Sequence, residues 1–230
     1  LPKSKIFFSS NVSRERGEHI SRESGIASTR ELGKYLGMPI LQKRINKDTF
    51  EEVLEKVASR LSGWKKQTLS LAGRVTLTKA VLSSIPVHQM STICLPASTL
   101  DKLDSLSRSF VWGRRQHLVS WDKICKPKAD GGLGIRVSSD MNKALIAKVG
   151  WRLLHDDKSL WARVLRGKYV VGDIQDPAWR VVGKTASSTW RSVALGIREV
   201  VVKGPGWVIG NGRRIKFWTD RWVSGRVLSE

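Results

Sequence analysis

The stretch DTFEEVLEKVASRLSGW, residues 48–64, decides the fold class of this chain. Asp48 stands three residues before Glu51, which is the spacing of a capping box with Asp in place of the usual Ser or Thr. The apolar side chains that follow recur at every third or fourth position and therefore share one face of a helix: Phe50, Val53, Leu54, Val57, Leu61 and Trp64. The stretch predicts an amphipathic helix that must bury this face against other elements.

Two more amphipathic helices are predicted after this one. The run SLAGRVTLTKAVLSSIP, residues 70–86, ends at Pro86 and carries a stripe of Leu71, Val75, Leu82 and Ile85. The next helix follows Pro96, with Ser98 as its expected N-cap, and its stripe consists of Leu100, Leu103, Leu106 and Phe110. We expect the three helices to pack together as a small bundle.

Short β elements are predicted at both ends of the chain. Residues 6–10 form a strand-like run, and GKYLGMPI, residues 33–40, frames a short apolar run with glycines and a proline. The polar residues 13–30 have no clean period and are expected to form a loop, with room for one helical turn. Near the C-terminus, WVIGNGRRIKFWTDRW, residues 207–222, contains an Asn-Gly pair, which is a strong hairpin signal.

A second helical lobe is predicted between the bundle and this hairpin. Its helices are expected over residues 139–155, 157–170 and 188–201, and on the middle one the apolar side chains should face inward and the basic ones outward: Leu160, Val164 and Leu165 against Arg163, Arg166 and Lys168. The stretch 119–136, rich in glycine and charge, is the expected domain boundary. It should contain a short extended piece at 119–121 and a turn at GGLG, which lacks the spacing of a phosphate loop.

The charge balance favours a polyanionic partner. Lys and Arg number 41 against 20 acidic residues, which gives a net charge of +21. An excess of this kind is typical of proteins that neutralise phosphates, and the alternatives are a merely soluble basic protein or one that meets an acidic protein. The charge is also uneven, because no acid occurs between Glu55 and Asp101, where six cations fall: Lys56, Arg60, Lys65, Lys66, Arg74 and Lys79.

The sequence argues against several other classes of protein. Cys94 and Cys125 lie too far from other Cys or His residues for a zinc knuckle, and two cysteines do not make a disulfide scaffold, so both are expected to be buried free thiols. The histidines are scattered without a catalytic spacing. The chain shows no apolar run long enough for a membrane span and no signal peptide, and it begins at Leu1, so we expect a piece of a longer intracellular protein, in the nucleus or the cytoplasm.

Five blocks in this order resemble plant LINE-type non-LTR retrotransposon reverse transcriptases, which are often labelled ribonuclease H-like proteins. They are GKYLGMPI, LSGWKKQTLSLAGRVTLTKAVLSSIP, FVWG, SWDKICKPKADGGLGIR and WVIGNGRRIKFWTDRW, and together they run over nearly the whole chain. The resemblance implies a mainly α chain from the region after the catalytic palm. It implies the end of a palm with a primer-grip-like segment over residues 1–45, a thumb-like helical bundle over 46–115 and a connection-like helical lobe over 116–230.

The resemblance also implies roles for individual residues. Lys3 resembles the lysine of the last palm motif, which lies near the incoming nucleotide. Tyr35, Leu36 and Gly37 match the primer-grip turn and would lie by the primer end. The thumb would hold the product duplex, and the last segment would lead toward a zinc-binding segment.

Three departures from the family argue against catalysis by this chain alone. The Tyr-x-Asp-Asp-type motif, whose aspartates would hold the Mg²⁺ ions of the intact polymerase, is absent. The adjacent pair Asp156-Asp157 follows a helical pattern and is interpreted as a helix end or cap. The zinc ligands and the ribonuclease H carboxylates are absent too, so no cofactor is expected in this chain.

Each candidate contact has a structural alternative. Lys65, Lys66, Arg74 and Lys79 are predicted phosphate contacts or else solvated surface. Tyr35 either packs its strand or stacks near the primer. The hairpin with Arg213, Arg214 and Lys216 is predicted to be mainly structural, with a side role toward single strands.

The predicted function is therefore to hold a primer–template, an RNA–DNA hybrid or another nucleic acid, without catalysis and without a membrane. The alternative is an independent basic adaptor whose exposed stripes bind a protein partner. The sequence leaves the oligomeric state open.

Overall fold

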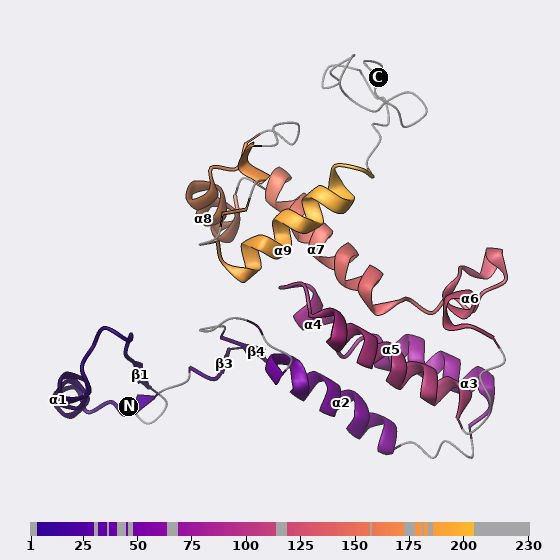
Figure 1. The fold of residues 1–230 in the computed structure, drawn as a ribbon, viewed down its shortest axis with the longest axis horizontal. Helices are drawn as coiled ribbons and strands as arrows, with labels where there is room; N and C mark the ends of the chain where they lie inside the picture. The colour runs from indigo at the N-terminus through magenta and orange to yellow at the C-terminus, as the bar shows by residue number, and fades with distance from the viewer. Residues whose placement is uncertain are drawn as a thin grey trace, which may run out of the picture. The chain divides into compact units, whose positions relative to one another are not determined.

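The computed structural model is mainly helical, as predicted, with short strands near the N-terminus (Figure 1). It divides into two compact units, Leu1–Thr49 and Phe50–Glu230. The assignment of segments to palm, thumb and connection stays a prediction. The residues that the structure describes are 4–29, 32–35, 37–40, 45, 48–63, 69–113, 119–156, 158–172, 178–180, 182–183 and 186–204. The predicted C-terminal hairpin lies outside them.

The first unit contains a helix where a loop was expected. Strands β1 (Ile6–Phe7) and β2 (Ser28–Thr29) pair in parallel, and α1 (Arg14–Ser24) runs between them. Ser13 caps α1 by accepting a hydrogen bond from the backbone N–H of Arg16 at 3.4 Å, and the helix ends at Gly25 in the left-handed region. The expected loop was wrong because these caps stabilise a helix that has almost no apolar face.

The second β element of the first unit is the predicted turn around residues 33–40. Strands β3 (Lys34–Tyr35) and β4 (Met38–Pro39) are antiparallel, and Tyr35 pairs with Met38. Gly37 lies in the connecting turn with φ of 81°, a conformation that glycine adopts without the steric cost of a side chain.

The second unit begins with the predicted bundle. Its elements are α2 (Glu51–Ser62), α3 (Leu71–Leu77), the π-helical turn η2 (Thr78–Leu82), α4 (Val87–Met90) and α5 (Ala97–Trp112). The short η1 (Asp48–Phe50) precedes α2, and its last residue is the first of this unit. Helix α2 packs against α5 and buries most of the predicted stripe: Phe50, Val53, Val57 and Leu61. Helix α5 begins at Ala97, so the predicted Ser98 cap was wrong by two positions.

The predicted inner face of the second helix was only partly right. Leu82 is buried, but Leu71 is exposed, and Arg74 and Thr78 occupy interior positions. The π-helical turn inserts an extra residue, and each residue rotates a helix by roughly 100°. A single stripe drawn through residues 71–85 therefore cannot describe both α3 and η2.

A buried amide joins the bundle to α7 (Ser138–His155). Asn142 on α7 accepts a hydrogen bond from the N–H of Leu95 at 2.8 Å and donates to the carbonyls of Met90 at 2.7 Å and Ile93 at 3.0 Å. The Met90 carbonyl lies at the end of α4 and the other two groups lie in the connection to α5, so α7 holds the start of α5 in place.

A carboxylate makes the second link between α5 and α7. Asp104 on α5 accepts hydrogen bonds from the Ser138 N–H at 3.2 and 3.3 Å and from its hydroxyl at 2.7 Å. It thereby supplies an acceptor for a backbone N–H in the first turn of α7, a helix that has no capping side chain of its own. Burial raises the pKa of Asp104 above its ordinary value, although the hydrogen bonds of Ser138 oppose this shift.

A second core surrounds Trp190. Together with α7 it is formed by α8 (Leu160–Tyr169), η4 (Ala178–Arg180), α9 (Ser188–Gly196) and the π-helical turn η5 (Ile197–Val201). Helix α6 (Trp121–Cys125), which η3 (Lys128–Asp130) follows, instead buries Trp121 and Ile124 with Val111 and Ile135 in a smaller cluster. Trp190 is buried and stacks on Tyr169 with 4.2 Å between ring centroids. The expected extended piece at 119–121 was wrong at its end, because Trp121 begins α6.

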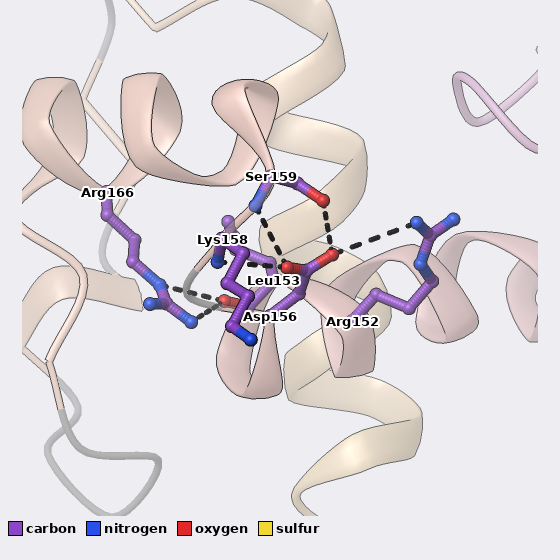
Figure 2. Close-up of polar contacts among 6 residues, drawn as sticks. All are labelled: Arg152, Leu153, Asp156, Lys158, Ser159 and Arg166. Carbon is purple, nitrogen blue, oxygen red and sulfur yellow. Dashed lines mark hydrogen bonds and ion pairs between the residues drawn. The ribbon is translucent and has the colours of Figure 1, made fainter.

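The corner between α7 and α8 confirms Asp156 as a helix end. Asp156 follows α7 and accepts hydrogen bonds from the backbone N–H groups of Lys158 at 3.1 Å and Ser159 at 3.0 Å, and also from the Ser159 hydroxyl (Figure 2). Across the corner, the Arg166 guanidinium donates to the Leu153 carbonyl (Figure 2). The carboxylate of Asp156 therefore has a structural role; Asp157 lies outside the described residues.

Helices α7 and α9 cross each other (Figure 1). They approach closely because each contributes a glycine to the contact, Gly150 on α7 and Gly196 on α9. A Cβ atom on Gly150 would lie 2.4 Å from Ile197 Cγ1. A Cβ atom on Gly196 would lie 2.8 Å from Ile146 Cγ2 and 2.9 Å from the backbone nitrogen of Ala147. A methyl group on Gly150 would have to displace the Ile197 side chain, whereas one on Gly196 meets the backbone of α7 and does not fit without moving one helix.

We predict that Gly196→Ala destabilises the protein by about 1–3 kcal/mol, because the added methyl group meets the backbone of α7. Gly167→Ala on α8 is the matched control, since a Cβ there would meet nothing within 4 Å. That substitution should instead stabilise the protein by about 0.5–1 kcal/mol. Denaturant unfolding measures both, and equal shifts of the same sign would contradict the close approach.

Candidate nucleic-acid interface

The ends of α2 and α5 lie on the side of the bundle where α3 begins (Figure 1). Each helix is followed by a glycine, Gly63 or Gly113, and then by a pair of adjacent cations in the sequence. The pairs are Lys65-Lys66 after α2 and Arg114-Arg115 after α5. We predicted the first pair and missed the second, although the similarity of GWKK and WGRR was a signal that could have found it.

Arg74 lies inside the bundle at this same end. Only 8% of the residue is exposed, and its Nε has no hydrogen-bond partner. The guanidinium packs against Gly113, where a Cβ would come within 2.6 Å of Nη1. Among the described residues no carboxylate forms an ion pair with it.

A buried guanidinium without a carboxylate is costly, because it gives up its hydration without a compensating charge. Nη1 reaches the end of α5, where the C-terminal carbonyls of a helix carry partial negative charge. The contact with phosphate that the sequence predicts for Arg74 stays a prediction. The burial of Arg74 against the end of α5 also gives it a structural role, which the sequence pattern did not show.

Lys79 is exposed but already has one partner. Its Nζ donates to the carbonyl of Leu133 at 3.0 Å and thereby ties η2 to the glycine-rich turn. A phosphate contact by Lys79 stays a prediction as well, and it would have to share this ammonium group with the turn.

The glycine-rich turn is confirmed as a turn. The N–H groups of Gly132, Leu133 and Gly134 donate to the carbonyls of Pro127 at 3.0 Å, Ile124 at 2.8 Å and Lys126 at 2.9 Å. A phosphate loop needs backbone N–H groups that point at the ligand, and these three are engaged.

The candidate primer-grip residues belong to the first unit. Tyr35 is 70% exposed, so its ring is not packed in a core, and it remains available for stacking. Gly37 forms the turn beside it. The other candidate residues lie outside the part of the chain that the structure describes: Lys3, Leu36, Lys65, Lys66, Arg213, Arg214 and Lys216.

The titratable groups of the described residues do not form a metal site. No group of three or more His, Cys, Asp or Glu side chains in this part of the chain could hold a metal ion. Both cysteines are free and only partly buried. Burial, and after it the charges of Asp104, Asp122 and Asp140, raise the pKa of Cys125 to about 11. A metal ligand or nucleophile must be a thiolate, and this thiol stays protonated near neutral pH.

No helix within the described ranges is long and apolar enough to cross a membrane.

We predict that Cys125 reacts with iodoacetamide at pH 8 roughly a hundredfold more slowly than free cysteine. The rate should rise about tenfold per pH unit up to pH 10, because the thiolate fraction does so below the pKa. Peptide-resolved mass spectrometry separates this cysteine from Cys94. A rate that levels off below pH 9 would contradict the raised pKa.

Comparison with known proteins gives two relatives from Arabidopsis thaliana, and no known family profile matches the chain. The chain is 61% identical over 198 residues to "Putative ribonuclease H protein At1g65750"; the match covers 84% of this chain and 32% of the relative. It is 36% identical over 146 residues to "Uncharacterized mitochondrial protein AtMg00310", with 61% of this chain and 93% of that protein covered. The chain thus spans about a third of the first relative and nearly all of the second.

Proposed function

This chain belongs to the same family as the Arabidopsis mitochondrial protein AtMg00310, and we propose that it is a retrotransposon-derived chain that holds a nucleic-acid duplex. The finer form of the proposal is that it corresponds to the region of a reverse transcriptase after the catalytic palm. The thumb-like bundle of α2, α3 and α5 would then carry the duplex.

The name of the first relative supports a connection with nucleic acid. That protein is named a ribonuclease H, and it shares 61% identity with most of this chain. The net charge of +21 supports the same connection, because each phosphate that a cation neutralises releases a counterion and adds salt-dependent affinity.

One observation carries the proposal. Helices α2 and α5 end on the side where α3 begins, and a pair of cations follows each of them in the sequence (Figure 1). Arg74 lies at that end with its guanidinium against Gly113. Helices α3 and α4 and the turn η2 between them contain no acid, so nothing within this segment offsets its positive charge.

The proposed contribution is positioning. A polymerase gains rate when the primer end is held against the reacting nucleotide, and a bundle that grips the duplex supplies this without chemistry of its own. No catalytic step is proposed for this chain, since its sequence lacks the paired aspartates of the polymerase motif.

We predict that Lys65→Glu with Lys66→Glu weakens binding to an RNA–DNA duplex by roughly tenfold or more at low salt. The logarithm of the affinity should also depend less steeply on the logarithm of the salt concentration, by about one to two in the slope, because two phosphate contacts are lost. Fluorescence anisotropy of a labelled duplex measures both quantities. Arg74 is left unchanged because it is buried and its substitution would also lower stability.

The matched control is Lys143→Glu with Lys158→Glu, which changes the net charge equally at exposed positions on and after α7. It should lower the affinity by much less. Equal losses in the two double variants would mean that only net charge matters, and the proposed interface would be rejected.

A further inference from the structure

An apolar groove lies between α8, α9 and α7 in the second unit. It has a volume of about 520 Å³ and is lined mainly by aliphatic and aromatic side chains: Val149, Leu160, Trp161, Val164, Leu165 and Val193. Leu160 is 74% exposed and Val164 is 58% exposed. Contiguous apolar surface of this kind is typical of protein interaction sites.

The predicted orientation of α8 was only partly right. Arg163 and Lys168 are exposed and Leu165 packs against the core, as predicted, but Leu160 and Val164 are exposed and Arg166 is half-buried. Ala162 is fully buried, and Arg166 reaches back across the corner to the carbonyl of Leu153 (Figure 2). These residues lie four apart and define the inner face of α8. Leu160 and Val164 therefore lie on the outer side, where they form one wall of the groove.

Two of the hydroxyl groups that line the groove, just after α4, already donate hydrogen bonds to the backbone. Ser91 donates to the carbonyl of His88 at 2.9 Å, and Thr92 donates to the same carbonyl at 2.7 Å. Thr189 is the third hydroxyl residue of a lining that is otherwise apolar. A phosphate or a base edge would lose most of its hydration there, so the groove does not suit the nucleic acid that the proposed function invokes.

Two cations lie on the helices that form the groove, Arg152 on α7 and Lys168 on α8, whose Nζ lies 5.5 Å from the centroid of the Tyr169 ring. The guanidinium of Arg152 lies 5.6 Å from the centroid of the Trp161 ring, and its side chain is largely exposed with only a 3.9 Å contact to Asp156. Lys168 is exposed and lies one turn after Val164 on the same stripe of α8. Asp156, the acid of this corner that the structure describes, already accepts hydrogen bonds from Ser159 and the backbone of Lys158.

We propose that this groove binds an acidic amphipathic helix of a partner protein. The apolar side chains of the helix would enter between α8 and α9, and its carboxylates would face Arg152 and Lys168. A second copy of this chain fits poorly, because two chains of charge +21 repel each other. The chain's own residues 205–230 fit poorly too, since they contain five cations and two acids.

The test uses the full chain and a fluorescent synthetic peptide. The peptide repeats leucine at every third or fourth position and carries glutamates on the opposite face. It should bind saturably, and a version with lysines in place of the glutamates should bind at least about tenfold more weakly. Arg152→Glu should weaken binding of the glutamate peptide and reduce its salt dependence. Equal affinity for the two peptides would overturn the proposal.

The apolar wall is tested by Leu160→Asn with Val164→Asn. Both residues are exposed, so circular dichroism and the melting temperature should stay close to those of the unmodified chain, while peptide affinity falls by at least about tenfold. Val119→Asn, another exposed apolar position, is the matched control and should leave peptide binding unchanged. Unchanged binding in the double variant would overturn the proposal. So would a dimer in sedimentation that the double variant abolishes, because the groove would then be filled by a second copy.

Failure here and failure of the proposed function are distinguishable. The groove variants should keep the affinity for the RNA–DNA duplex, and the Lys65→Glu, Lys66→Glu variant should keep the affinity for the peptide. Loss of both affinities in the groove variants would overturn the assignment of a separate protein-binding surface.

Discussion

The amide of Asn142 is the contact on which the rest of the second unit depends. It forms hydrogen bonds with three backbone groups of the segment from Met90 to Leu95, and each of them would cost about 1–3 kcal/mol if it stayed buried without a partner. Ser192 on α9 holds the same segment by accepting a hydrogen bond from the N–H of Cys94 at 2.8 Å. The bundle is thereby joined to α7 and α9, so the candidate nucleic-acid interface and the apolar groove belong to one compact unit.

Much of the helical content could be predicted, because a buried face leaves a period in the sequence. The stripe through Phe50, Val53 and Val57 predicted α2 for this reason, and the same argument located α5 and α7. The period of apolar residues predicts less where a helix depends on its capping residues or where an inserted residue interrupts it. Helix α1 depends on the Ser13 and Gly25 caps, and η2 inserts a residue that changes which side chains of α3 are buried.

The candidate site was predictable only in part, because a local sequence pattern shows where charges lie along the chain but not which way each side chain points in the fold. The cations between residues 55 and 101 are visible in the sequence as a run without acids. That Arg74 packs against Gly113 depends on the contact between α3 and α5, which no local pattern encodes. The same holds for α8, which packs against the core through Ala162 but exposes Leu160, because Arg166 reaches back to the carbonyl of Leu153.

The most direct measurement of where the duplex lies is photochemical crosslinking. An RNA–DNA duplex that contains 4-thiouridine would be irradiated with the full chain, and the crosslinked peptides identified by mass spectrometry. If the end of the bundle carries the duplex, the crosslinks should fall in residues 60–79 and 109–118, on either side of Gly63 and Gly113. Crosslinks confined to α7, α8 and α9, or spread evenly over the chain, would contradict a bundle that grips nucleic acid at one end.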